Sequence, residues 1–549
     1  MFTQPIRLTI TALTVCFLVS IGKADEQKRL NPRLTPGKDF VASLEFKSAV
    51  LVEEDDPTRL TFHLNGAAQS SSVRRSMCVV FEEASVSHLP LKPLVHPTLN
   101  ESDLVRVASQ NKILYVLLPK PAEPATAETE LPNQMASPAG VTTEPLNAAI
   151  DIQLEINKLA TTGGTLHLPN GVYNINKPIT VPSNVSIEGD GSNTLIVNKS
   201  SNYAIKIVGV NTLATRIMQD ISQAGGVGTS HPAIRVENAT GFVVGGSVKI
   251  VKDNAFPLKT EFNKVFSIAG NVITFQDNFI ENYRVADAVK VVAVTPVKNV
   301  TIRNLTITCE AGTSGFGVFA SNTETLQLTN LRLNNIARKS IHVESSYLPR
   351  IENNTLMNNG GPGKGDYGIG SAMNMGANVT GNKLASSGAI VVKGNLHAIV
   401  KNNHSDSTGL TGGDGISVIS TIGSTFEGNT ISRSKCYGIW MHHSSERNSV
   451  SNNQFASGIT SAIYVTNDCV ENIISDNMLT NNNGNGVGLD DTADRNIVKG
   501  NLSRGNKGCG IIVHGAGNSV VGNTLRLNGL EPLLIREGRG NIVRDNLVQ

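Results

Sequence analysis

The chain has 549 residues, of which 40% are hydrophobic and only 17% are charged. So low a charged fraction excludes a coiled coil, and 47 basic against 45 acidic residues exclude the strongly basic surface of a nucleic-acid-binding protein. Because the chain contains one Trp and only 5% aromatic residues, we expect an aliphatic and repetitive interior rather than an aromatic-rich globular core.

The N-terminal residues have the pattern of a secretory signal peptide. Arg7 supplies a positive charge, and Leu8–Ile21 is an apolar run too short to span a bilayer comfortably. Gly22 and Ala24 then place small residues at the positions that a signal peptidase reads. We therefore predict a signal peptide at residues 1–24. Since no later segment is apolar enough to form a membrane span, we expect a secreted or periplasmic protein.

Two further segments precede the main body of the chain. Residues 25–118 contain the β-like runs FVASLEF, RLTFHL and ILYVLLP, which predict a small β-rich accessory domain. Residues 119–143 are rich in Pro, Ala, Thr and Glu, a composition typical of a linker.

From residue 299 onward, a phrase that contains a marker asparagine returns at a nearly constant interval. The marker positions are Asn304, Asn330, Asn354, Asn382, Asn403, Asn429, Asn453, Asn477, Asn501, Asn523 and Asn546. The mean interval is (546−304)/10, or 24.2 residues. Two short strands and one asparagine-marked turn in each interval predict an all-β solenoid, a parallel β-helix. Asparagine tolerates the left-handed backbone of a sharp turn, and stacked asparagines can form a hydrogen-bonded ladder.

The start of this region resembles a known superfamily. Asn147–Ile175 (NAAIDIQLEINKLATTGGTLHLPNGVYNI) and VSIEGDG at 185–191 are similar to the helix, Gly-Gly turn and "LPxGxY" strand of pectin-lyase-like right-handed parallel β-helix proteins. The resemblance covers residues 144–549 and implies an N-terminal capping helix. It also implies a role among the superfamily's polysaccharide lyases, uronate epimerases, glycoside hydrolases, phage tailspikes and adhesins. Residues 210–298 break the repeat, and their strand-like runs predict a strand-rich excursion.

The alternation of side chains along a strand predicts a solvent-facing strip on one side of the β-helix. If Ile439 and Met441 point inward, Trp440 and His442 point outward. The same alignment places Gly317 in the column of Trp440. The candidate substrate-binding residues on this strip are Trp440, Tyr464, His443, Arg536 and Glu344. Exposed aromatic rings suit sugar rings, so the predicted ligand is a polysaccharide.

One segment of the strip resembles a catalytic motif. Tyr437-Gly438-Ile439-Trp440-Met441-His442 has the tyrosine-to-histidine spacing of the mannuronan C-5 epimerase motif Y-G-F-D-P-H, with Trp440 and Met441 in place of its Asp and Pro. The resemblance implies a lyase or C-5 epimerase that removes H-5 from an acidic, uronate-containing glycan. His442 would then be the base and Tyr437 the opposing acid or base, while Lys393 or Arg536 neutralises the carboxylate.

Two alternatives remain open. Asp468, Asp490-Asp491 and His514 lie on three consecutive coils and resemble the polygalacturonase order of Asp, Asp-Asp and His, which implies inverting hydrolysis by two carboxyl groups about 6.5–9.5 Å apart. The catalytic candidates thus also include Asp490 and His514, and Asp468, Asp490 and Asp491 are the candidate ligands if Ca²⁺ takes part. The second alternative is a non-catalytic glycan-binding or tailspike-like protein.

Overall fold

A computed structural model of the full chain describes residues 151–222, 231–252, 256–359, 366–406, 413–458, 460–536 and 539–549, together with the backbone of six strands before residue 118. The chain divides into two compact units, Met1–Thr142 and Thr143–Gln549. In the first unit the strands pair as β1 (Ile6–Ile10) with β2 (Phe40–Leu44), β3 (Ala49–Asp56) with β4 (Arg59–Asn65), and β5 (Leu104–Ser109) with β6 (Lys112–Leu117). The predicted linker and, apart from β1, the predicted signal peptide lie outside the described residues.

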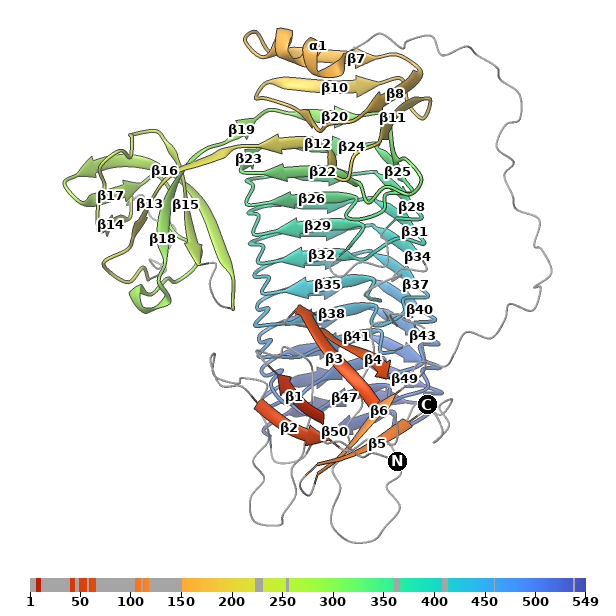
Figure 1. Cartoon of the computed structure of the whole chain (residues 1–549). Coiled ribbons are helices and arrows are strands. Elements are labelled where there is room, and N and C mark those ends of the chain that lie inside the picture. The colour runs from red at the N-terminus through yellow and green to blue at the C-terminus, as the bar shows by residue number, and fades with distance from the viewer. Residues whose placement is uncertain are drawn as a thin grey trace, which may run out of the picture. The chain divides into compact units, whose positions relative to one another are not determined.

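The second unit is a parallel β-solenoid in which each coil contributes one strand to each of three sheets (Figure 1). Sheet 1 has twelve strands: β9 (Ile179–Thr180), β12 (Tyr203–Val208), β22 (Phe316–Ser321), β26 (Ile341–Glu344), β29 (Ile369–Ala372), β32 (Ile390–Lys393), β35 (Ile416–Ile419), β38 (Ile439–His442), β41 (Ile463–Val465), β44 (Val487–Leu489), β47 (Ile511–Val513) and β50 (Leu533–Ile535). Sheet 2 has thirteen: β7 (Gly164–Leu168), β10 (Val185–Gly189), β20 (Thr301–Arg303), β24 (Gln327–Thr329), β27 (Arg350–Glu352), β30 (Asn378–Thr380), β33 (Ile399–Lys401), β36 (Thr425–Glu427), β39 (Ser449–Ser451), β42 (Ile473–Ser475), β45 (Ile497–Lys499), β48 (Ser519–Val521) and β51 (Ile542–Arg544). Sheet 3 also has thirteen: β8 (Gly171–Ile175), β11 (Thr194–Asn198), β21 (Thr306–Cys309), β25 (Arg332–Asn334), β28 (Thr355–Met357), β31 (Lys383–Ala385), β34 (His404–Asp406), β37 (Thr430–Ser432), β40 (Gln454–Ala456), β43 (Met478–Thr480), β46 (Leu502–Arg504), β49 (Thr524–Arg526) and β52 (Leu547–Val548).

The core of the solenoid is a stack of aliphatic side chains. Ile416, Ile439 and Ile463 are register partners on neighbouring strands of sheet 1, and each is fully buried in the same hydrophobic cluster. Strand neighbours stack about 4.8 Å apart, so the buried side chains of successive strands form a continuous core. The predicted all-β solenoid with about 24 residues per coil is confirmed.

Asparagine ladders hold the corners between the sheets. From Asn354 to Asn546, each predicted marker donates its side-chain amide to the side-chain oxygen of the next, at 2.9–3.0 Å. A second ladder runs from Asn448 to Asn518 in the turn before sheet 2. The assignment of Asn304 and Asn330 to the first ladder was wrong, because the register pairs Thr329 with Glu352 and so puts Asn330 one residue before the ladder position. Asn304 and Asn330 instead adopt the left-handed backbone, with φ of 57° and 53°.

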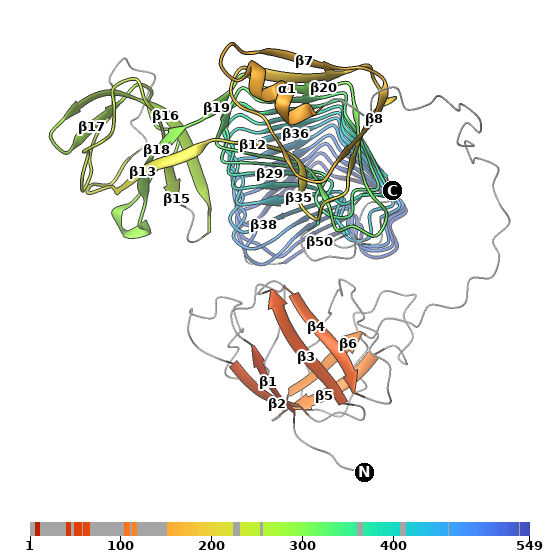
Figure 2. The same cartoon turned by 45° about the horizontal axis from the view of Figure 1, so that its top comes forward.

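A helix lies at the β7 end of the stack (Figure 2). Helix α1 (Ile152–Leu159) begins with Asp151, whose side chain accepts a hydrogen bond from the backbone N–H of Leu154. Its buried residues Ile152 and Ile156 belong to the same hydrophobic cluster as the coils. No helix among the described residues is long and apolar enough to cross a membrane.

The predicted excursion is an antiparallel sheet, hereafter the insert, that leaves the solenoid between β12 and β20 (Figure 1). Its strands, in sheet order, are β13 (Val210–Arg216), β18 (Lys290–Thr295), β15 (Ser247–Lys252), β16 (Lys259–Ala269), β17 (Val272–Phe275) and β14 (Ala233–Arg235). The insert has its own hydrophobic core around Phe275 and Tyr283. Glu281 forms an ion pair with Lys259 inside the insert, at 2.7 Å, and a second ion pair with Arg447 that joins the insert to the solenoid.

Candidate functional site

Sheet 1 places the predicted strip residues in two outward columns. Trp440 is the register partner of Ser417 on one side and of Tyr464 on the other. The second column contains Glu344, Ala372, Lys393, Ile419 and His442 on successive strands. Backbone hydrogen bonds extend it through Thr466, Asp490, His514 and Arg536. The prediction that Gly317 belongs to the first column was wrong, because the residue that pairs with His342 of that column is Phe319. Gly317 and Phe319 are two residues apart, so the alternation of inward and outward side chains on this strand is unchanged.

Three aromatic rings form a platform on this face. The rings of Tyr437 and Tyr464 stack with centroids 4.9 Å apart and planes at 17°. Trp440 contacts Tyr437 at 5.7 Å between ring centroids, and its indole N–H donates to the Thr466 hydroxyl at 3.3 Å. Gly488, the next residue in the column, leaves room for the Tyr464 ring, because an added Cβ would lie 2.7 Å from it. All three rings are only partly buried, so they present a hydrophobic surface.

His442 faces outward as predicted but is covered by its neighbours. Its ring stacks on Trp440 with centroids 3.9 Å apart, and only 5% of the residue is exposed. Its Nε2 lies 3.3 Å from the Ser417 hydroxyl, and its Nδ1 contacts Nδ1 of His443. Burial, with smaller effects from the charges of His443 and Lys393, lowers the pKa of His442 well below its ordinary value. The imidazole is therefore neutral near pH 7, the form that can accept a proton.

His443 connects the strip to the insert. Its ring packs against Phe256 of the insert, with centroids 4.4 Å apart. Burial and the charge of Lys393 lower its pKa to about 4. Its Nε2 is buried and has no hydrogen-bond partner among the described residues. Phe256 was missed by the sequence analysis, because nothing in its local pattern indicates which coil it reaches.

The acidic candidates lie further along the same columns. Asp490 accepts hydrogen bonds from the backbone and hydroxyl of Thr492, each at 3.0 Å. Burial raises the pKa of Asp490 to about 6, although these bonds favour its charged form. Asp491 forms an ion pair with Arg536 at 2.8 Å. The backbone N–H of Asp468 donates to the Thr492 hydroxyl at 3.0 Å, and His514 follows Asp490 in the column.

Three of these residues, Asp468, Asp490 and Asp491, are the candidate ligands if Ca²⁺ takes part. Among the described residues, no three His, Cys, Asp or Glu side chains are grouped so that they could hold a metal ion. Asp490 and Asp491 are already engaged by Thr492 and Arg536 respectively.

Glu344 lies at the opposite end of the strip, in a cluster that the sequence analysis did not identify. It forms an ion pair with His342 at 3.2 Å, and the hydrogen bond from His342 holds the pKa of the Glu344 carboxyl below its usual value. The Tyr203 hydroxyl lies 3.4 Å from the other ring nitrogen of His342. Phe319 stacks on Tyr203 with centroids 5.0 Å apart. The cluster could not be predicted from local pattern, because Tyr203 and His342 are 139 residues apart in the sequence.

Comparisons with known proteins are consistent with the coiled architecture. The family described as the right handed beta helix region matches residues 235–404 and 367–525. No curated protein matches the chain. Among solved structures, the chain is similar to the tailspike gp61 of Pseudomonas phage phi297, with 14% identity, 68% of each chain covered and a TM-score of 0.43. It is also similar to the A-module of the Azotobacter vinelandii mannuronan C-5 epimerase AlgE4, with 10% identity, 72% of this chain and 92% of that chain covered and a TM-score of 0.36. The surface adhesin PfbA of Streptococcus pneumoniae shares 11% identity, with 70% of this chain and 88% of that chain covered and a TM-score of 0.41.

Proposed function

This chain belongs to the family of right-handed β-helix regions, as its sequence pattern predicted, and from that premise we propose that it acts on a polysaccharide bound along the outward face of sheet 1. The observation that carries the proposal is the register pairing of Trp440 with Tyr464, extended by the stacking of Tyr437 on Tyr464. Aromatic faces present a flat apolar surface with a polar edge, which suits a sugar ring. Strands two coils apart are separated by about 10 Å, the scale of one to two sugar units.

We further propose that the glycan is acidic and that the reaction begins with removal of H-5 from a uronate. Lys393 supplies positive charge on this face, and its charge contributes to the lowered pKa of both His442 and His443. The neutral His442–His443 pair would take the H-5 proton while Lys393, two strands away in the same column, neutralises the carboxylate. Arg536 lies four strands from His442 and is paired with Asp491. Proton return from Tyr437 to C-5 on the opposite face completes epimerisation. Proton donation to the departing O-4 completes elimination.

Product analysis on polygalacturonate, polymannuronate and polyguluronate tests this proposal. A lyase yields an unsaturated product that absorbs ultraviolet light, and an epimerase changes the C-5 configuration seen by proton NMR without shortening the chain. Binding to the strip is followed by fluorescence, because Trp440 is the chain's sole Trp. A protein that neither binds nor alters any of these polymers would contradict the proposal.

The second candidate function is inverting glycoside hydrolysis, which one observation favours. The pKa of Asp490 is raised to about 6 by burial, so part of its population is protonated near neutral pH and could act as the general acid. New reducing ends without ultraviolet absorbance would identify hydrolysis.

The third candidate is glycan binding without catalysis. The contact of Trp440 with both Tyr437 and His442 favours it, because the indole occupies space beside both proton carriers.

We also propose that the protein is secreted or periplasmic, because residues 1–24 have the pattern of a signal peptide. Mass spectrometry of the protein purified from its native host tests this. Cleavage after Ala24 is the expected result.

A further inference from the structure

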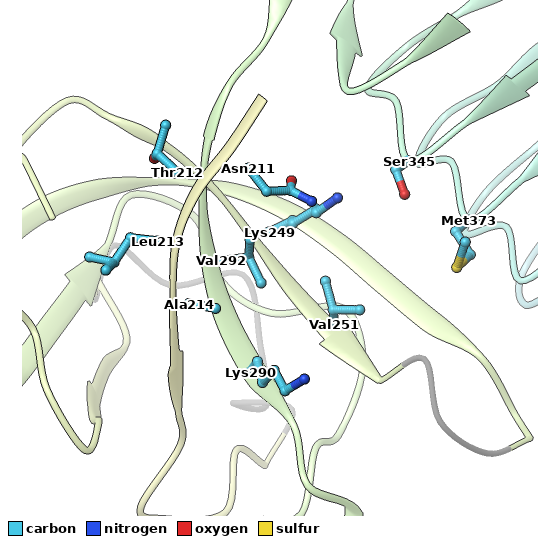
Figure 3. Close-up of a pocket in the computed structure, with 10 residues that line it drawn as sticks. All are labelled: Asn211, Thr212, Leu213, Ala214, Lys249, Val251, Lys290, Val292, Ser345 and Met373. Atoms are coloured by element: carbon cyan, nitrogen blue, oxygen red, sulfur yellow. The ribbon is translucent and has the colours of Figure 1, made fainter. Parts of the chain in front are cut away.

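A cavity of about 420 Å³ lies between the insert and the solenoid (Figure 3). On the insert side it is lined by residues of β13, β15 and β18, including Asn211, Lys249 and Lys290. On the solenoid side it is lined by Ser345 and Met373, which directly follow β26 and β29. The cavity therefore borders sheet 1 at the C-terminal ends of β26 and β29.

The insert presents two different faces, and the cavity lies on the second one. Val248 and Ile250 of β15 point into the hydrophobic core of the insert. The residues that alternate with them, Lys249 and Val251, point to the opposite face, where Val251 packs in a small cluster with Val292 and Val294. Lys249 is only 5% exposed, and its ammonium group donates to the Asn322 side chain at 2.7 Å.

The charges that line the cavity have one sign. Among the described residues that line it, there are two lysines, Lys249 and Lys290, and no aspartate or glutamate. Arg216 on β13 is the register partner of Lys290, so a third cation lies directly across from it. Like charges directly opposite each other in antiparallel strands are destabilising. A negatively charged ligand would offset the repulsion between Lys290 and Arg216.

We propose that this cavity binds an anionic substituent, a carboxylate or a sulfate, of the glycan that lies along sheet 1; this inference rests on the proposed function and specifies its substrate class. Ser345 and Met373 each follow a residue of the second outward column, Glu344 and Ala372. A sugar above β26 and β29 would therefore have the cavity beside it. The lysine ammonium groups and the Ser345 hydroxyl are hydrogen-bond donors suited to an oxyanion.

Glu344 is an acidic residue next to this site, and its carboxylate is paired with His342. Its carboxylate is bonded to His342 at 3.2 Å, on the sheet 1 side. Lys249 also acts on Glu344, since its charge contributes, after that of His342 and Lys339, to the lowered pKa of the carboxyl. Glu344 is thus paired with His342 at the end of β26, and the two lysines line the cavity beside this pair.

The test is calorimetric titration of the full-length protein with oligogalacturonate, dextran sulfate and uncharged dextran. We expect Lys249→Met and Lys290→Met each to weaken binding of the anionic glycans by at least about 10-fold and to leave dextran binding unchanged. Lys264→Met is the matched control, because Lys264 is an exposed lysine of the same insert that does not line the cavity. Lys290 is only partly buried, so its variant keeps the test valid if Lys249→Met does not fold, as judged by circular dichroism.

The outcomes separate this inference from the proposed function. Wild-type affinity in both lysine variants, with binding lost in Trp440→Ala, would overturn the cavity site alone. Lost affinity in the lysine variants, with wild-type binding in Trp440→Ala and Tyr464→Ala, would support the anion site in the cavity. It would contradict glycan binding by the aromatic platform. If sodium sulfate or sodium glucuronate raises the melting temperature of the wild type but not of Lys249→Met, and no polymer binds, the ligand is a small free anion and the glycan assignment is overturned. Binding of none of these probes would overturn both.

Discussion

The indole of Trp440 lies flat on the imidazole of His442, with 3.9 Å between ring centroids and 12° between ring planes. The two residues are neighbours on the outward side of β38, separated by the buried Met441. This contact covers the proposed base, so the ring that we propose as a surface for a sugar also limits the solvent access of His442.

Replacing Trp440 with Ala should raise the pKa of His442 towards its ordinary value, because burial is the main cause of the lowered pKa. Histidine resonances followed by NMR across a pH titration measure the shift. Tyr464→Ala is the control, since Tyr464 stacks on Tyr437 rather than on His442. An unchanged pKa of His442 in Trp440→Ala would show that the indole does not desolvate the imidazole.

The second prediction concerns the asparagine ladder. Asn453 donates its side-chain amide to the Phe426 carbonyl at 2.9 Å and to Asn477, and accepts from Asn429. Asn453→Leu should lower the free energy of unfolding by about 1–3 kcal/mol, because buried partners lose their hydrogen bonds. Thermal or urea denaturation measures the loss.

The last ladder position provides the comparison. Asn546 is only partly buried and donates to the Val520 carbonyl, but it has a ladder neighbour on one side, Asn523. Asn546→Leu should therefore cost less than Asn453→Leu. Equal losses at both positions would argue against a ladder whose strength depends on stacking from both sides.

The repeat predicted the solenoid because the inward aliphatic residues and the turn asparagines recur together. It misplaced Asn304 and Asn330 because the phrase often carries two adjacent turn residues, as in Asn353-Asn354, of which only the second belongs to the ladder. The outward direction of His442 was predictable from alternation. Its burial was not, because it depends on how the Trp440 ring turns and on Phe256 of a distant insert reaching His443.

A third prediction concerns pH and the buried Glu261 of the insert. Its carboxylate accepts from the backbone N–H of Ile280 at 2.6 Å and from the Tyr283 hydroxyl at 3.2 Å. Burial nevertheless raises its pKa from 4.5 to about 7. The folded state therefore binds the proton more tightly than the unfolded state. This contribution to stability is fully present below pH 4.5 and is lost as the pH rises through about 7.

Glu261→Gln should flatten this part of the stability profile. Between pH 4.5 and about 7, the slope of unfolding free energy against pH should change by up to about 1.4 kcal/mol per pH unit, the value for one proton. The wild-type profile also includes His443, whose lowered pKa makes stability rise with pH between about 4 and 6.5. The difference between the two proteins isolates Glu261. Identical slopes would show that Glu261 titrates normally in the folded protein.

The last prediction tests the proposed chemistry at His442. His442→Ala should lower the turnover of an anionic polysaccharide by about 10²–10⁴-fold, the usual cost of losing a general acid–base group. The fold should survive, because the coil is held by the fully buried Ile439 and Met441 on the other side of β38. Glycan affinity should change little, since Trp440 and Tyr464 remain. The matched control is His404→Ala, whose exposed side chain lies on sheet 3 and should be silent. Wild-type turnover in His442→Ala would exclude H-5 abstraction by this residue, and activity lost instead in Asp490→Asn would move the reaction to the carboxylates and favour hydrolysis.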